Sequence, residues 1–281
     1  MINQNYDYIL YSGSVAGVVI STNLKRKGYS VLLLNRYGFC GGTITESLNL
    51  HQRMTCDLIK KDSITSFIIE KLINSKESYI FMDYNYFVLN PEFLKYELQR
   101  ILVENGVDSL FHIITKKIEK NENGFVVTVY GREGDIKLNA KKIIDASSDF
   151  SFYSCLSPSD RELVRGFVNI ITTPVKDSSI FDNAYKKILL NDKRWWVSYE
   201  IEVNNLFEIE IQSQCILDEI NKKLLEQNSR IQLVPAQSNL IFKLKDYKKT
   251  PDFITFFDFV ENFDSTDEFI LSSIMEKNLT I

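Results

Sequence analysis

"YILYSGSVAGVVISTNLKRKGYSVLLLNRYGFCGG", Tyr8 to Gly42, is the stretch of sequence that decides the fold. A continuous apolar and aromatic run over residues 6–11 precedes a Gly/Ser turn and predicts a buried strand. Apolar residues at helical spacing predict a helix over 16–27, and residues 29–35 predict a second buried strand. Strand, helix and strand within about thirty residues form a βαβ unit, which implies a parallel sheet.

Further along the chain the signals for helices and strands stay clear up to about Asp149 and are weaker after it. Asn90 as a cap, Pro91 in the first turn and a stop at Gly106 predict a helix. Residues 107–147 read as a strand and a β-meander that ends in "IIDAS". Beyond Asp149 we expect strands at 164–175, 194–203, 230–245 and 252–260, and a helix over 210–229. A closing helix at 265–278 would be capped by Ser265 or Thr266.

Composition excludes several classes of function. The 281 residues are 44% hydrophobic and 25% charged, with a formal net charge of −4 and no basic face, which argues against nucleic acid as a partner. Two histidines and four scattered cysteines predict neither a metal site nor a disulfide framework, so we expect a reducing cytoplasm. The N-terminus does not read as a signal peptide, and no apolar run is long enough to cross a membrane.

Three separated pieces of the sequence together resemble FAD-dependent oxidoreductases of the two-dinucleotide-binding-domain type. They are "DYILYSGSVAG", "LLLNRYGFCGGTIT", and the stretch from "NPEFLKYELQRILVENG" to "KKIIDASSD". The resemblance implies an α/β fold: a Rossmann-like FAD/NAD(P)-binding parallel sheet with a β-meander, and a smaller α+β substrate region. FAD-binding segments are then expected at 1–56, 90–150 and 250–281, and substrate or cap segments at 57–89 and 151–249.

In this family the first turn carries three glycines, for a tight turn, close approach of the pyrophosphate and helix packing. Here these positions are Ser12, Ser14 and Gly17, with Gly13 and Ala16 also small. A positive φ at Ser12 would cost on the order of 1–2 kcal/mol. The serine hydroxyls could bind a phosphate oxygen, or the serines could mark a turn that binds nothing.

The resemblance places further cofactor contacts along the chain. Asn35 stands where the family has a ribose-binding acid, and Arg36 beside it would suit a 2′-phosphate or simply lie in solvent. Gly41, Gly42 and Thr43 match a second turn against the pyrophosphate. Ile114 matches a position that borders the adenine, and Asp145 matches one below the pyrophosphate. Asp258 matches a late aspartate of the family. Ser148 and Phe257 each replace a family glycine.

His51 is the one candidate catalytic residue, as a proton donor or substrate contact, although an ordinary loop histidine is the alternative. The expected function is an FAD-dependent oxidoreductase acting on a small organic substrate, with the flavin carrying the redox step. A cofactor-free relative with a structural or partner-binding role beside a true flavoenzyme is the alternative, and a nicotinamide or another nucleotide is a third. A protein partner or a homo-oligomer stays open.

Overall fold

A sheet whose central strands run parallel forms the frame of the N-terminal half. The computed structural model describes residues 4–53, 63–84, 86–156, 161–202, 206–245, 247, 249–250, 252–259 and 267–279. Within them the strand order of this sheet is β6-β2-β1-β9-β8-β7, and β15 pairs with β9. The strands are β1 (Asn5–Tyr11), β2 (Val31–Leu34), β6 (Asp108–Leu110), β7 (Ile114–Asn121), β8 (Gly124–Gly131), β9 (Gly134–Asp145) and β15 (Phe253–Ile254).

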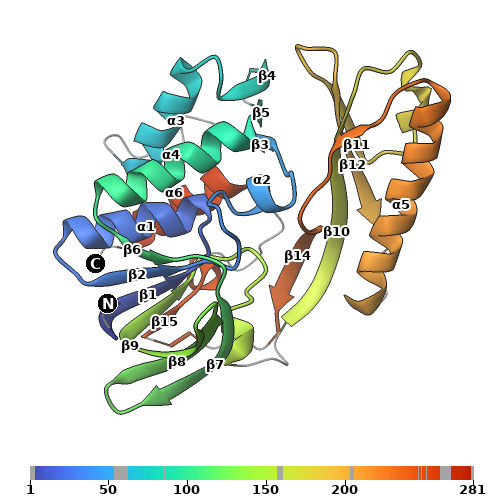
Figure 1. The fold of residues 1–281 in the computed structure, drawn as a ribbon. Coiled ribbons are helices and arrows are strands. Elements are labelled where there is room, and N and C mark those ends of the chain that lie inside the picture. The colour runs from blue at the N-terminus through green and yellow to red at the C-terminus, as the bar shows by residue number, and fades with distance from the viewer. Residues whose placement is uncertain are drawn as a thin grey trace.

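The central strand β1 is apolar because both of its faces are covered. It pairs in parallel with β2 and β9, and Leu10 lies opposite Leu33 on one side and Ile144 on the other. All three side chains are fully buried. Helices α1 (Val15–Arg26), α4 (Pro91–Glu104) and α6 (Glu268–Asn278) lie on one side of the sheet, and the β7–β9 meander extends it below (Figure 1). The predicted α/β fold with a parallel sheet and a meander is confirmed.

Local signals set the ends of the first helices. Ser14 caps α1 and accepts a hydrogen bond from the backbone of Gly17, so this helix begins one residue before the predicted start. Asn90 caps α4 as predicted, accepting from the backbone of Glu92, and Pro91 occupies the first turn. The caps fix the directions in which both helices leave the sheet.

A second, antiparallel sheet forms the other lobe, with strands in the order β11-β12-β10-β13 and with β14 also paired to β10. Helix α5 (Leu206–Glu226) covers its outer face, while its inner face turns toward the first lobe (Figure 1). The Asn169 side-chain amide donates to the Ser47 carbonyl and the Trp196 indole to the Leu48 carbonyl, which join the lobes. The strands are β10 (Arg161–Thr172), β11 (Lys186–Leu189), β12 (Trp195–Ile201), β13 (Ile231–Leu233) and β14 (Asn239–Leu244).

A small third sheet lies beside the first lobe, in the order β3-β5-β4. Its strands are β3 (His51–Arg53), β4 (Tyr79–Asp83) and β5 (Tyr86–Leu89). Two further helices are α2 (Thr43–Glu46) and α3 (Ile64–Asn74), and short 3-10 turns lie at Tyr153–Cys155 and Ser178–Phe181.

The C-terminal elements differ in detail from the sequence-based prediction. The strand expected at 252–260 is only β15, because the chain turns at once into the 3-10 turn η5 (Phe256–Asp258). The Asp258 carboxylate accepts from the backbone N–H of Thr255 at 2.7 Å and holds that turn. Asp267 caps α6, whereas the caps expected from the sequence, Ser265 and Thr266, lie outside the described residues.

Candidate functional site

The turn after β1 holds its shape through hydrogen bonds within the chain. Ser12 adopts a φ of 87°, in the left-handed region that favours glycine. The backbone N–H of Gly13 donates to the Asn35 side-chain oxygen at 2.8 Å, and that of Ser14 donates to the Ser12 hydroxyl at 3.2 Å. Ser12 therefore adopts the left-handed conformation that a glycine would adopt at this position, and its hydroxyl accepts the bond that closes the turn.

Ser14 connects the start of α1 to the end of β9. Its hydroxyl accepts from the backbone N–H of Gly17 at 3.0 Å and donates to the Ala146 carbonyl at 2.8 Å. Gly17 has no room for a side chain, because a Cβ there would collide with the Ser12 carbonyl. Ala16 beside it is fully buried. The glycine needed for helix packing is thus explained by geometry, and the Ser14 hydroxyl is already used in structural bonds.

A second turn, at Gly41 and Gly42, packs against the first. Gly41 has a φ of 125°, and its N–H donates to the Gly13 carbonyl at 2.7 Å. Gly42 has a φ of 54° and leads directly into α2 at Thr43. These positive angles explain both glycines, and they bring the Thr43 N–H close to the start of α1.

Sequence reasoning missed the residue that joins the two turns, which is Glu268. One of its carboxylate oxygens accepts from the Thr43 N–H at 2.8 Å and from the Thr43 hydroxyl at 3.1 Å. The other accepts from the Val15 N–H, in the first turn of α1, at 3.2 Å. Its only sequence signal is that of an ordinary acid in the first turn of a helix, which favours the helix dipole.

Two contacts fix the backbone of Glu268 in this place. Its N–H donates to the Gln52 side-chain oxygen at 2.8 Å, and the preceding Asp267 accepts from the Arg53 N–H at 2.6 Å. The side chain is only 1% exposed. Burial raises the pKa of Glu268 to about 7, in spite of the hydrogen bonds from Thr43 and Val15, which favour the charged form.

The cavity between the two turns is small. Its volume is about 30 Å³, which is close to the share of liquid volume of one water molecule. Among its lining residues are Ser12, Asn35, Arg36, Gly42, Thr43, Glu46, Ser148, Asp149 and Glu268. Burial and the nearby Glu268 and Asp149 raise the pKa of Glu46 to about 8. The site therefore holds several acids, and the described conformation does not fit the pyrophosphate of a dinucleotide.

Of the remaining predicted cofactor contacts, Asp145, Ile114 and Asp258 lie away from the cavity between the turns, and Arg36 lines it. Asp145 is fully buried and accepts from the backbone of Ser147 and Tyr153, and burial raises its pKa to about 7. Ile114 opens β7 and is 58% exposed. Asp145 and Ile114 do not line the cavity between the turns, and neither does Asp258, which interacts with Thr255 and Lys249. Arg36 does line it, and its own side chain is exposed.

His51 lies in a separate cleft between β3 and the inner face of the second sheet. Its ring stacks on Tyr86 at 4.7 Å and faces Trp196 at 6.0 Å. The Lys186 ammonium group lies 3.0 Å from Nδ1. Burial, and then the charge of Lys186, lower the pKa of His51 to about 4, so the ring is neutral near pH 7.

Because an ammonium group can only donate, Nδ1 of His51 accepts from Lys186 and the ring hydrogen is on Nε2. The cleft has a volume of about 190 Å³ and a largely polar lining. Besides His51 and Lys186 it is lined by Asn49, Arg165, Phe167, Asn169, Tyr185, Trp196, Ser198, Asn239 and Ile241. The arrangement offers hydrogen-bond donors and positive charge to a small polar molecule.

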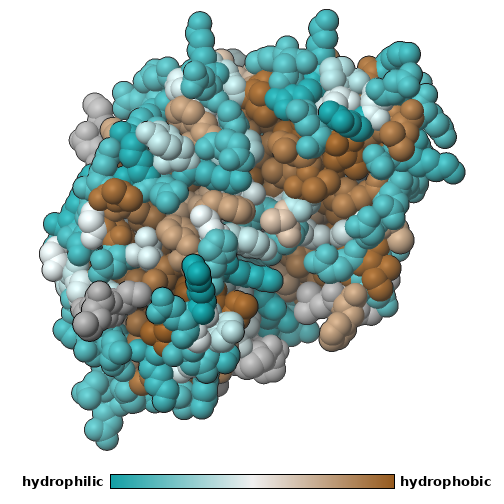
Figure 2. Space-filling model, in the orientation of Figure 1, coloured by the Kyte–Doolittle hydropathy of each residue, from teal (hydrophilic) through white to brown (hydrophobic). Residues whose placement is uncertain are grey.

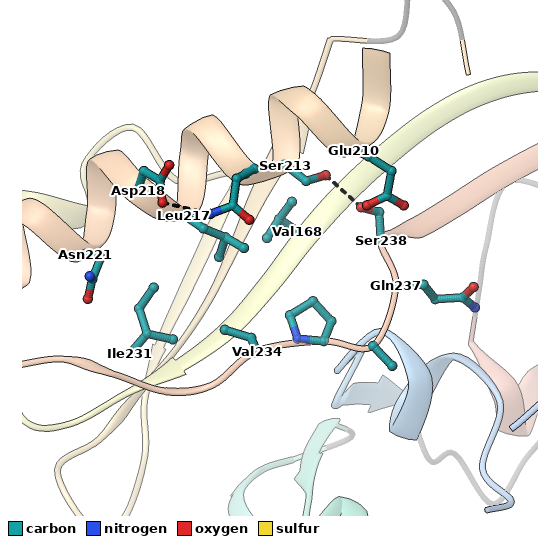
Figure 3. Close-up of a pocket in the computed structure, with 13 residues that line it drawn as sticks. Val168, Glu210, Ser213, Leu217, Asp218, Asn221, Ile231, Val234, Gln237 and Ser238 are labelled. Atoms are coloured by element: carbon teal, nitrogen blue, oxygen red, sulfur yellow. Dashed lines mark hydrogen bonds between the residues drawn. The ribbon is translucent and has the colours of Figure 1, made fainter. Parts of the chain in front are cut away.

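A larger groove of about 440 Å³ lies on the far side of the second sheet, between α5 and residues 231–238. In Figure 3 Leu217 extends from the helix and Val168 lies between the helix and the segment that carries Ile231 and Val234. Glu210 and Asp218 lie on the helix. In Figure 2 apolar residues gather in a hollow beside α5. None of its lining residues was a sequence-based candidate. The groove shares Gln237 with the cavity between the turns and shares no lining residue with the cleft around His51.

Within the described residues, no three His, Cys, Asp or Glu side chains are grouped so that they could hold a metal ion. None of the helices in that part of the chain is both long and apolar enough to span a membrane.

Comparison with protein families matches residues 7–152, just over half of the chain, to the family described as FAD dependent oxidoreductase. No curated protein matches the chain. The matched segment contains both turns, β1 to β9 and His51. FAD is the cofactor of this family, so the sequence-based prediction of an FAD flavoprotein family is confirmed.

Several solved structures share the fold at low sequence identity. A geranylgeranyl bacteriochlorophyll reductase-like protein from Thermoplasma acidophilum has 12% identity and a TM-score of 0.63, over 97% of this chain and 76% of that one. A flavoprotein/dehydrogenase from Cytophaga hutchinsonii has 14% identity and a TM-score of 0.60, over 96% and 75%. Aklavinone-11 hydroxylase, solved with FAD and aklavinone, has 11% identity and a TM-score of 0.57, over 91% and 57%. This chain therefore spans between about half and three quarters of their lengths.

Proposed function

The chain belongs to the family of FAD-dependent oxidoreductases, and we propose that it acts on a small organic substrate held in the cleft beside His51. The observation that carries the proposal is the polar lining of this cleft around a neutral histidine. In this family the flavin supplies the redox chemistry, and the protein binds and orients the substrate. Relatives in fold such as aklavinone-11 hydroxylase bind small molecules, which supports the same substrate class.

Each residue in the cleft has a proposed role that follows from its chemistry. His51 would donate from Nε2 to a carbonyl or carboxylate oxygen, since Lys186 holds Nδ1 as an acceptor. Lys186 would supply positive charge. The stacked rings of Tyr86 and Trp196 fix the plane of the imidazole, so its donor direction is set before a substrate arrives.

The test begins with FAD binding. The full-length protein is titrated with FAD over a wide range of concentrations, and binding is followed by calorimetry and by the change in the flavin spectrum. Small ketones, aldehydes and carboxylic acids are then titrated while the flavin spectrum is followed, in the wild type and in His51→Gln. We expect bound flavin, a spectral response to one of these classes, and loss of that response in His51→Gln with unchanged FAD binding. A folded protein that retains no FAD at any concentration contradicts the proposal.

One observation favours a second candidate function, a cofactor-free relative that binds a protein partner. The backbone N–H groups of Gly13, Ser14, Val15 and Gly17 all donate to side chains of this same chain. These are the groups that a helix N-terminus would offer to a phosphate. A folded protein that binds no flavin but associates with a second flavoprotein would support this candidate.

A further inference from the structure

The Glu268 carboxylate lies where two phosphate-binding turns of a dinucleotide fold converge. It accepts from Val15, in the first turn of the twelve-residue helix α1, and from Thr43 after Gly42. A carboxylate and a phosphate are both anionic acceptors, and a buried N–H group needs an acceptor of some kind. We infer that Glu268 takes the place of the cofactor phosphate and holds this site closed, so that its carboxylate and the FAD pyrophosphate exclude each other.

Space supports this exclusion. With Glu268 in place the cavity between the turns is about 30 Å³, and a pyrophosphate is several times larger than one water. At Gly42 even an added Cβ would collide with the Glu268 carboxylate, so the side chain lies directly against the turn. A phosphate that approached the Val15 and Thr43 amides would have to occupy the volume of these carboxylate atoms.

Charge supports it as well. The charge of Asp267 on α6 raises the pKa of Glu268. The charges of Glu268 and Asp149 in turn raise the pKa of Glu46 on α2. Arg36 is the one Lys or Arg side chain among the described residues that line the cavity. A pyrophosphate added beside an ionised Glu268 would place like charges together in a buried site, which is unfavourable.

The inference rests on the proposed function only for the identity of the ligand, FAD. Its test uses the full chain in three forms: wild type, Glu268→Ala and Glu276→Ala. Glu276 is a matched control on the same helix, because its carboxylate also accepts from two helix-start amides, those of Ile64 and Thr65 on α3. FAD affinity is measured by calorimetry after circular dichroism confirms that each protein is folded.

We expect Glu268→Ala to bind FAD at least tenfold more tightly than the wild type, and Glu276→Ala to bind it like the wild type. If Glu268→Ala does not fold, Glu268→Ser also empties the space of the carboxylate, and an increase in affinity is again expected. A second readout needs no flavin: acetate, compared with chloride at equal ionic strength, should raise the melting temperature of Glu268→Ala and leave that of the wild type unchanged.

Equal or weaker FAD binding by Glu268→Ala, with tight binding by the wild type, overturns the inference and leaves the proposed function standing. Failure of all the folded proteins to bind FAD overturns both, because the carboxylate would then not be what excludes the cofactor. Tight FAD binding by Glu268→Ala with no response to any substrate class supports the inference and contradicts the proposed function.

Discussion

The backbone N–H of Gly13 donates to the side-chain oxygen of Asn35 at 2.8 Å, and this bond ties the first turn to the end of β2. The amide nitrogen of Asn35 donates in turn to the carbonyls of Tyr37 and Phe39, at 3.1 and 2.7 Å. The side chain is 2% exposed. An amide can both accept and donate, whereas the acid that the family has at this position can only accept.

Asn35→Asp should therefore destabilise this protein, although it restores the family residue. Two carbonyls would lose their donor and face a buried carboxylate, which we expect to lower the free energy of unfolding by about 2–3 kcal/mol. Urea denaturation measures it. Asn105→Asp is the matched control, since Asn105 also accepts from Arg26 and donates to the Ile101 carbonyl but is less buried, and it should be close to neutral. Unchanged stability in Asn35→Asp would contradict the bonding described.

Ser12→Gly should be more stable than Ser12→Ala. Both variants lose the bond from the Ser14 N–H, but at a φ of 87° only the glycine is free of strain, and the difference in unfolding free energy should be about 1 kcal/mol. Ser12→Ala should also be less stable than the wild type, because it keeps the strain and loses the bond. Thermal and urea unfolding of the three proteins check the order, and a Ser12→Gly protein less stable than Ser12→Ala would refute it.

Ser14→Ala should destabilise the protein. It removes the cap of α1 and the bond to the Ala146 carbonyl, and the loss should be roughly 1–2 kcal/mol of unfolding free energy. The same denaturation series measures it. Ser63→Ala, at the cap of α3, is the control for a cap without a bond to a distant strand, and it should cost less.

The raised pKa of Glu268 predicts that the stability of the protein depends on pH. Its pKa is raised from 4.5 to about 7, so between these values the folded state binds more protons than the unfolded state. The free energy of unfolding should therefore fall as the pH rises, and the loss should be complete above about pH 7. Glu46 contributes in the same direction up to about pH 8.

Glu268→Gln isolates this contribution. From about pH 5 to about pH 8, we expect the stability of the variant relative to the wild type to rise by roughly 2–3 kcal/mol. Urea denaturation at each pH gives the difference. A difference that stays constant with pH would show that Glu268 does not carry a raised pKa.

Lys186→Met should raise the pKa of His51 from about 4, because it removes a neighbouring positive charge. The pKa should stay below its ordinary value, since burial is the larger cause and the methionine keeps the cleft filled. An NMR titration of the imidazole follows it, and His51→Gln assigns the resonance in a chain with two histidines. An unchanged or lower pKa would mean that the Lys186 ammonium group does not face the ring.

The sequence by itself predicted the elements whose signals are local. The βαβ unit at the N-terminus and the helix that starts at Asn90 follow from apolar periodicity and caps, which act within a few residues. The early glycines and their serine replacements were also readable, including the strain at Ser12. The short β15 was not predicted well, because the turn held by Asp258 interrupts an apolar run that otherwise reads as a strand.

Only the tertiary structure decided what occupies the two turns. Glu268 is 253 residues from Val15 and 225 from Thr43, and in sequence it is an ordinary first-turn acid. A buried N–H must find an acceptor, but which acceptor it finds depends on what the folded chain brings within reach. The local sequence determines where the N–H donors of a dinucleotide turn lie, because these donors are backbone groups at regular spacing along the chain. The acceptor they meet is a property of packing, and here packing places a carboxylate of the closing helix among them.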